Sequence, residues 1–297
     1  MIKVKKGVLS VLLIIAGVLA LALILFFILR PSPNPLIGFD LEQVIGTGKI
    51  TPSNTYTPSN PELEVPLISI VVDDNGYNLQ QSRMAFSLPF PLTISVMPSL
   101  KYSRDVALEA KRHGKEVILH CPMESHKGND WLGPGAILSS MSDEEVKKQV
   151  EADLYDVPGA IGMNNHMGTK VTEDRRVMGA ILSYLKERGL FFLDSRVTPK
   201  SVARELGNQI GIPVLENDLS LDHDTNPKAI RENMRKLGEI AKRKGSAIGI
   251  IHIYTKDIIS LLKEGVDLWN KEGIRIVPLS EILLKFWPSW KIPDESN

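Results

Sequence analysis

Short apolar runs rich in β-forming residues recur along the chain from Leu67 onward, and stretches with helical spacing separate most of them. The runs occupy residues 67–72, 92–97, 116–120, 159–163, 190–194, 213–215, 247–252 and 274–278. This alternation is typical of parallel α/β folds, because neighbouring parallel strands need a crossover connection that is usually a helix. The chain has seven or eight such runs and no GxGxxG fingerprint. We therefore predict an α/β barrel rather than a doubly wound sheet.

The intervening segments carry helix-end signals. Ser142 and Glu145 have capping-box spacing before an apolar periodic stretch. Asn226-Pro227 predicts the start of a helix that ends at Gly245, and Gly189 predicts the end of another helix.

The N-terminus has the pattern of a membrane anchor. Lys3, Lys5 and Lys6 precede an uncharged run from Gly7 to Leu29, and Arg30 ends that run. A helix of this length spans a hydrocarbon core of about 30 Å. No small-residue cleavage site follows the run, so we predict an uncleaved anchor at residues 1–30. The lysine bias predicts a cytoplasmic N-terminus and an extracytoplasmic domain in a single-pass protein of the cytoplasmic membrane.

Composition separates a linker from a globular domain. Residues 31–66 contain seven prolines among Ser, Thr and Asn, a composition that favours an extended stalk. Residues 67–297 are predicted to form the barrel domain. Lysine plus arginine equals aspartate plus glutamate at 35 each, which gives no electrostatic reason to expect nucleic-acid binding. Cys121, the single cysteine, lies in an apolar run and is interpreted as a packing residue.

Polar residues follow several of the predicted strands at the point where each strand ends. Buried parallel strands are nearly all apolar, so these exceptions carry information. The residues concerned are Asp73 and Asp74 after the first run, His120 after the third, Asn164, Asn165 and His166 after the fourth, Asp194 and Arg196 after the fifth, and His252 after the seventh. Because the carboxyl ends of parallel barrel strands share one rim, we expect these side chains to converge there.

Asp74, His120 and His166 together suggest a metal site. One carboxylate and two imidazoles leave open coordination positions on a divalent ion, as in hydrolytic rather than structural sites. Zn²⁺ is the expected ion.

The ordered motifs resemble those of the divergent polysaccharide deacetylases, members of the glycoside hydrolase/deacetylase superfamily. The motifs are Asp-Asp-Asn-Gly at 73–76, His-Cys-Pro-Met-Glu at 120–124, Asn-Asn-His-Met-Gly at 164–168, Leu-Asp-Ser-Arg at 193–196 and the late histidine at 252. The resemblance covers about residues 67–287 and implies a distorted (β/α)₇ TIM-like barrel. It also implies metal-dependent removal of acetyl groups from a polysaccharide.

The resemblance implies a role for each matching residue. Asp73 would be the general base, Asp74 and His120 metal ligands, and His252 the acid that protonates the leaving group. The better-studied deacetylases carry two histidines four residues apart, whereas this chain has His120 and Glu124. His166 is therefore the expected third ligand, and Glu124 is the alternative.

Two further polar groups are open to more than one interpretation. Asp194 could orient His252, and Arg196 could neutralise Asp194 or bind substrate; equally, the two could form an ion pair with no chemical role. The cluster Asp222-His223-Asp224 is interpreted as a loop rather than part of the site.

Two alternative functions remain at this point. A barrel that binds envelope glycan or a partner protein without turnover is one. A metal-independent glycosidase using Asp74 and Asp194 is the other, but it would leave the three histidines without a role. Oligomeric state is not predictable from the sequence.

The predicted topology is testable with protease added to intact cells or spheroplasts. We expect digestion of residues 67–297, because the anchor would place them outside the cytoplasm. Complete protection of the domain until the membrane is dissolved would contradict this orientation.

Overall fold

The computed structural model describes residues 65–293, and the predicted anchor at residues 1–30 lies outside them, as does the linker up to residue 64. Within the described part, no helix has the length and apolar character needed to cross a bilayer.

The described strands form one curved parallel sheet. Its nine strands run in the order β6-β5-β4-β3-β2-β1-β8-β7, and β9 pairs with β1. Their bounds are β1 (Leu67–Asn75), β2 (Thr93–Val96), β3 (Glu116–Met123), β4 (Gly162–Met167), β5 (Phe191–Asp194), β6 (Val214–Glu216), β7 (Leu219–Ser220), β8 (Ser246–His252) and β9 (Arg275–Ile276). Among these strands no pairing joins β6 to β7, so the barrel is open there.

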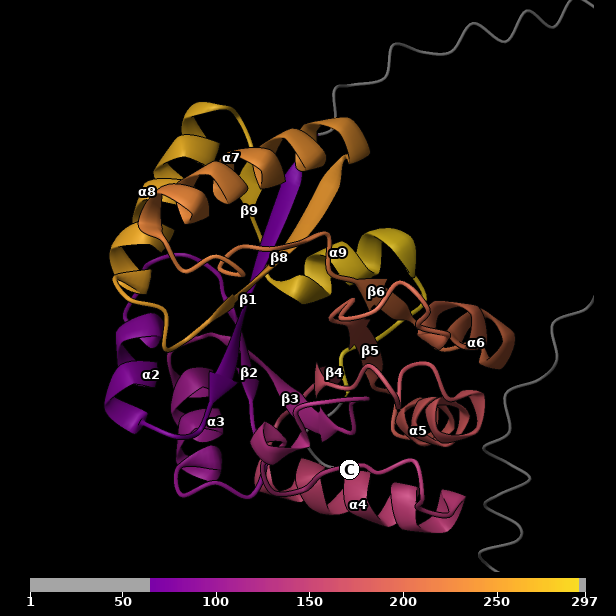
Figure 1. The fold of residues 1–297 in the computed structure, drawn as a ribbon. Helices are drawn as coiled ribbons and strands as arrows, with labels where there is room; N and C mark the ends of the chain where they lie inside the picture. Colours follow the sequence, from indigo (N-terminus) through magenta and orange to yellow (C-terminus); the bar gives the residue numbers. More distant parts are fainter. Residues whose placement is uncertain (1–64, 294–297) are drawn as a thin grey trace, which may run out of the picture. The chain divides into compact units, whose positions relative to one another are not determined.

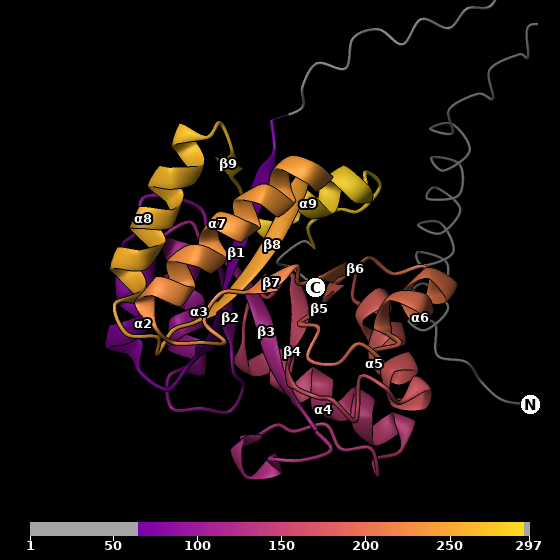
Figure 2. The same ribbon diagram turned by 45° about the horizontal axis from the view of Figure 1, so that its top comes forward.

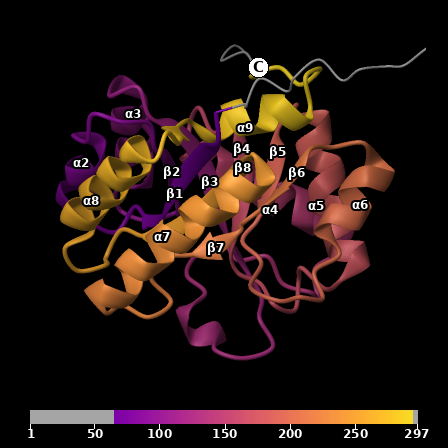
Figure 3. The same cartoon turned by 90° about the horizontal axis from the view of Figure 1, so that it is seen from above.

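Helices cover the outer side of this sheet, except the last one, which lies across one end of the barrel (Figures 1 and 2). They are α2 (Leu79–Phe86), α3 (Ser103–Arg112), α4 (Asp143–Asp156), α5 (Arg175–Glu187), α6 (Ala203–Ile210), α7 (Pro227–Lys244), α8 (Ile258–Lys271) and α9 (Leu279–Phe286), with a 3₁₀ turn η1 (Asn129–Trp131) after β3. The view from above shows α2, α3, α7 and α8 grouped beside β1, with α5 and α6 beside β5 and β6 (Figure 3).

Two hydrophobic clusters follow from the alternation of side chains along the strands. Ile68, Ile70 and Val72 belong to the large cluster that also contains the buried helix residues, whereas Leu67 and Val71 belong to a smaller one. The smaller cluster fills the barrel interior and includes residues of α9. Helix α9 therefore closes the end of the barrel where the strands begin.

Buried polar side chains accept hydrogen bonds from the first backbone N–H groups of α9. The N–H of Leu279 donates to Thr93 Oγ1 (3.3 Å), and that of Ser280 donates to the carboxylate of Glu116 (3.2 Å). These groups would otherwise lack partners at a buried helix terminus.

The structure confirms the predicted parallel α/β class, and each of the eight predicted runs overlaps a strand. The capping box at Ser142 and Glu145 is present, Asn226 caps α7, and Gly245 ends α7 in the left-handed conformation. The two-residue strand β7 was not predicted, because so short a strand has no measurable periodicity.

Candidate active site

Strand alternation directs several polar side chains into the barrel at its carboxyl-end rim. In β1 the interior positions are Leu67, Ser69 and Val71, so Asp73 falls on the same side. The same parity, counted from interior Ile118 in β3 and Ile250 in β8, places His120 and His252 inward. In β4, Met163 packs on the outer cluster, so Asn164 and His166 face inward.

Asp74 interrupts the alternation that would send it to the opposite face. Its φ is 61°, and the pairing of β1 with β2 shifts register between Val72 and Asn75. The Asn75 side chain stabilises this bulge, since its Nδ2 donates to the carbonyls of Val72 (2.7 Å) and Ser95 (3.2 Å). The bulge lets two consecutive carboxylates face one site.

Asp74, His120 and His166 bring three donor atoms together. Oδ1 of Asp74 lies 3.1 Å from Nε2 of His120 and 3.0 Å from Nδ1 of His166, and the two nitrogens are 3.2 Å apart. Ligands about 2.0–2.1 Å from a tetrahedral Zn²⁺ are separated by about 3.3 Å, so the triangle has the size of one face of such a site. Oδ1 of Asp74 is also buried without a well-aligned hydrogen-bond donor. The donor set therefore fits a divalent metal ion.

The electrostatics of this triad favour positive charge. Burial alone would raise the pKa of Asp74, but the two imidazoles outweigh burial and hold it well below its usual value. Burial would lower the pKa of His120, yet the carboxylates of Asp73 and Asp74 raise it. A proton or a metal ion is thus stabilised between these groups.

Asn164 connects the expected base to the expected ligand. Its Nδ2 donates to both oxygens of Asp73 (3.0 and 3.2 Å), and its Oδ1 lies 2.9 Å from Nδ1 of His120. A carboxylate only accepts hydrogen bonds, so the amide nitrogen must face Asp73 and the amide oxygen must face His120. His120 then carries its proton on Nδ1, which leaves Nε2 free to bind a metal.

The turn η1 determines which ring nitrogen of His166 carries the proton. Nε2 of His166 lies 3.3 Å from the backbone carbonyl of Trp131, which can only accept a proton. The proton of His166 is therefore on Nε2, and Nδ1 faces Asp74.

His252 lies beside Asp73, with which it is paired across β8 and β1. Its Nδ1 is 2.9 Å from Oδ1 of Asp222, whose other oxygen accepts from the His252 backbone N–H (2.8 Å). Burial alone would lower the pKa of His252, but the hydrogen bond and charge of Asp222 raise it to about 9. Asp222, which lies in the turn after β7, therefore takes the place beside His252 that was predicted for Asp194, although the sequence indicated Asp222 as a loop residue outside the site.

Asp194 and Arg196 lie apart from this constellation. Phe191 and Leu193 face the interior, so parity turns Asp194 outward and brings Ser195 to the inner side. Oδ1 of Asp194 accepts the Arg196 backbone N–H (2.8 Å), while the Arg196 guanidinium pairs with Glu216 (3.3 Å). This favours a structural role, and it removes the acid that a glycosidase mechanism would pair with Asp74.

Ser195 instead takes the inner place, where its hydroxyl lies 3.3 Å from Asn164 Nδ2 and donates to the carbonyl of Asn165 (2.8 Å). Counting every second residue from the inward-facing Phe191 would have placed Ser195 on the inner side.

Glu124 is engaged outside the triad. Its carboxylate accepts from the backbone and hydroxyl of Ser139 (both 2.7 Å) and from Lys170 (2.7 Å). The hydrogen bond from Lys170 is the main cause that lowers the pKa of Glu124 to about 2. Both oxygens are thus occupied, which favours His166 over Glu124 as the third ligand.

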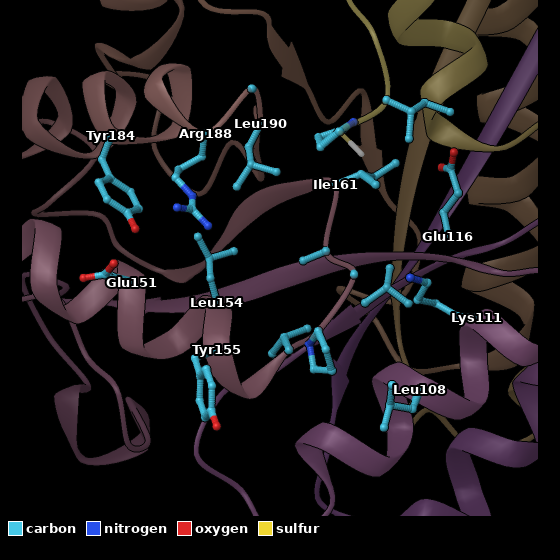
Figure 4. Close-up of a pocket in the computed structure, with 18 of the residues that line it drawn as sticks. Leu108, Lys111, Glu116, Glu151, Leu154, Tyr155, Ile161, Tyr184, Arg188 and Leu190 are labelled. Carbon is cyan, nitrogen blue, oxygen red and sulfur yellow. The ribbon is translucent and has the colours of Figure 1, made fainter. Parts of the chain in front are cut away.

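A groove in the described part of the chain lies elsewhere. It is lined by residues such as Glu116, Ile161 and Leu190, which stand where β3, β4 and β5 begin (Figure 4). None of the polar residues described at the carboxyl-end rim lines it. The groove is therefore at the opposite end of the barrel from the converging carboxylates and imidazoles.

One solved structure supports the fold. A protein of Agrobacterium tumefaciens C58 superimposes with a TM-score of 0.70 at 23% identity, covering 74% of this chain and 89% of that one. The chitin deacetylase of Colletotrichum lindemuthianum matches less closely, with a TM-score of 0.48 and 12% identity over 78% of this chain and 93% of its own.

Sequence comparison identifies the family. An uncharacterized protein of Haemophilus influenzae is 30% identical over 232 residues, which cover 74% of this chain and 81% of that protein. YibQ of Escherichia coli is 30% identical over 185 residues, and the match spans 58% of its length and 62% of this chain. The sequence model of the divergent polysaccharide deacetylases matches residues 70–283. Since that match covers most of the chain, the protein belongs to the divergent polysaccharide deacetylase family.

Proposed function

We propose that this protein is a metal-dependent hydrolase that removes acetyl groups, bound through nitrogen or oxygen, from a polysaccharide. One observation carries the proposal. Three groups lie together at the rim. They are the carboxylate of Asp73, the triad Asp74–His120–His166, and His252 with its partner carboxylate. Asp73 is the candidate base because it is not one of the three donors of the triad. A binding protein would have no need for this combination.

Asp74, His120 and His166 would hold the ion, and Zn²⁺ suits their donor set. When bound, such an ion lowers the pKa of a water molecule to about 7 and polarises an acyl carbonyl. Asp73 is placed to accept a proton during attack, because Oδ2 lies 3.7 Å from His120 Nε2 at the edge of the triad. Asn164 fixes the orientation of the Asp73 carboxylate. His252, kept protonated by Asp222, would donate a proton to the departing amine or alkoxide.

The predicted anchor gives the proposal a location. An extracytoplasmic domain tethered at residues 1–30 would meet polysaccharide of the cell envelope. The alternative of glycan binding without turnover is distinguished by acetate release from acetylated polysaccharide, which only the hydrolase would catalyse.

The choice of third ligand is testable by zinc titration of purified variants. His166→Ala should weaken zinc binding by more than about 100-fold, since even changes outside the coordination sphere cost about 10–100-fold. Glu124→Ala is the matched control and should bind zinc like the wild type, because both Glu124 oxygens are held by Ser139 and Lys170. Loss of zinc in Glu124→Ala with retention in His166→Ala would reverse the assignment.

Asp73→Asn separates the base from the ligands. The amide preserves the shape of the side chain but cannot accept a proton, so acetate release should fall by about 10²–10⁴-fold. Zinc content, measured by elemental analysis, should stay near that of the wild type. Undiminished turnover in Asp73→Asn would show that another group is the base, and a wild-type protein that binds zinc but releases no acetate would favour the binding alternative.

The pH dependence of turnover tests the role of Asp222. A general acid works only while protonated, so wild-type kcat should fall as pH rises through the His252 pKa of about 9. Asp222→Asn removes the charge that raises this pKa, which should then move down toward the ordinary histidine value of about 6.5. The alkaline limb of the kcat profile should shift to lower pH, so the variant loses more activity at pH 8 than at pH 6. An unshifted alkaline limb would mean that His252 does not act as the acid.

A further inference from the structure

Three large aromatic side chains stand in solvent around the candidate active site. Trp131 is 80% exposed, Tyr254 59% and Tyr77 55%. They follow the carboxyl ends of β3, β8 and β1, the strands that supply His120, His252 and both aspartates. Several aromatic rings gathered around one site favour ligand binding there, because covering their apolar surface is favourable.

Contacts place each of these residues near the site, Trp131 through its backbone and Tyr254 through its ring. The Trp131 carbonyl is the partner of His166 Nε2 (3.3 Å), and the Tyr254 ring stacks on His252 with centroids 5.3 Å apart and an interplanar angle of 21°. A Cβ built on Gly133 would lie 3.7 Å from the Tyr77 hydroxyl, so Tyr77 reaches the backbone two residues beyond Trp131.

The turn that presents Trp131 is held in place. The Asn129 side chain accepts from the Ser125 backbone N–H (2.8 Å) and donates to the Ser125 carbonyl (2.9 Å). Leu132, the next residue after the turn, is buried. The indole is thus displayed by a fixed backbone while its own surface remains in water, which lowers the entropy lost when a ligand covers it.

The electrostatics agree with this placement of the tyrosines. Burial and then the charge of Asp74 raise the pKa of Tyr77, and the same two causes lead in raising the pKa of Tyr254 to about 12. Both hydroxyls therefore lie within reach of the field of the triad.

We propose that Tyr77, Trp131 and Tyr254 form the surface on which pyranose rings of the polysaccharide stack next to the candidate active site. The inference rests on the proposed function for the chemistry at the rim. The apolar C–H face of a pyranose ring stacks on an aromatic ring, and its hydroxyl edge remains hydrated. An extended chain could cover rings on both sides of the triad, whereas a single sugar could not.

The experiment compares two acetyl donors with the zinc-loaded full-length protein in detergent. Trp131→Ala removes the most exposed ring but keeps the backbone carbonyl that His166 needs. On partially acetylated chitosan, acetylated xylan or acetylated peptidoglycan strands, whichever the wild type deacetylates, KM should rise by about threefold to tenfold, the range expected for one aromatic stacking contact. The KM for 4-nitrophenyl acetate should rise by less than the KM for the polymer.

Tyr155→Ala is the matched control. Tyr155 is 75% exposed but lies at the end of α4 beside the groove at the other end of the barrel (Figure 4). This variant should behave like the wild type with both kinds of substrate. Equal KM values for Trp131→Ala and Tyr155→Ala on the polymer would overturn the inference while leaving the hydrolase proposal intact.

A binding measurement separates the two proposals further. Trp131 is exposed, Trp269 is fully buried, and Trp287 and Trp290 are partly buried, so glycan contact should alter Trp131 fluorescence. The three polysaccharides named above serve as titrants, and Trp131→Phe should lose the signal. Binding through Trp131 without acetate release would support the surface and refute the hydrolase. Acetate release from a polymer without any change in Trp131 fluorescence would support the hydrolase and refute the surface.

Discussion

The candidate site depends on a local break in strand alternation at Asp74. In an uninterrupted strand, Asp73 and Asp74 would point to opposite faces, and Asp74 would be buried among the outer hydrophobic residues. The left-handed backbone at Asp74 and the register shift against β2 bring both carboxylates to one side. Such a conformation is unfavourable for a residue with a side chain, so the surrounding structure must hold it in place. The Asn75 side chain does so by hydrogen bonding to the carbonyl of Val72.

The second constraint is a neutral connection between base and ligand. Asn164 is fully buried, and its amide joins Asp73 to His120. The connector is uncharged, and it orients the carboxylate through hydrogen bonds from its amide nitrogen. The same amide fixes the proton of His120 on Nδ1. One side chain therefore orients both the proposed proton acceptor and a proposed metal ligand, which gives a reason for a buried polar residue in β4 inside an apolar sheet.

Much of this arrangement could be predicted from the sequence, because it follows from strand order. Parallel strands present their carboxyl ends at one rim, so apolar runs followed by Asp73, His120, His166 and His252 were enough to expect convergence. Parity explains the main error. Asp194 ends a strand too, but it lies one position away from the inward-facing register, and a one-residue difference reverses the side of the sheet.

Asp222 was missed for a different reason. It follows β7, a strand of only two residues. No apolar run in the sequence therefore indicated that its side chain also lies at the rim. The bulge at Asp74 could not be predicted either, because the sequence Asp-Asp-Asn-Gly is also typical of an ordinary turn. Contacts between side chains distant in sequence, such as that of Asn164 with Asp73, depend on register and cannot be derived from local pattern.

We propose that Asp74, His120 and His166 together bind one metal ion through one defined atom each. Anomalous diffraction at the zinc absorption edge from crystals of the zinc-loaded protein tests it most directly. We expect a single strong peak within about 2.0–2.2 Å of Asp74 Oδ1, His120 Nε2 and His166 Nδ1. Zinc bound at another place, or through Nδ1 of His120, would contradict both the ligand set and the tautomer that Asn164 imposes.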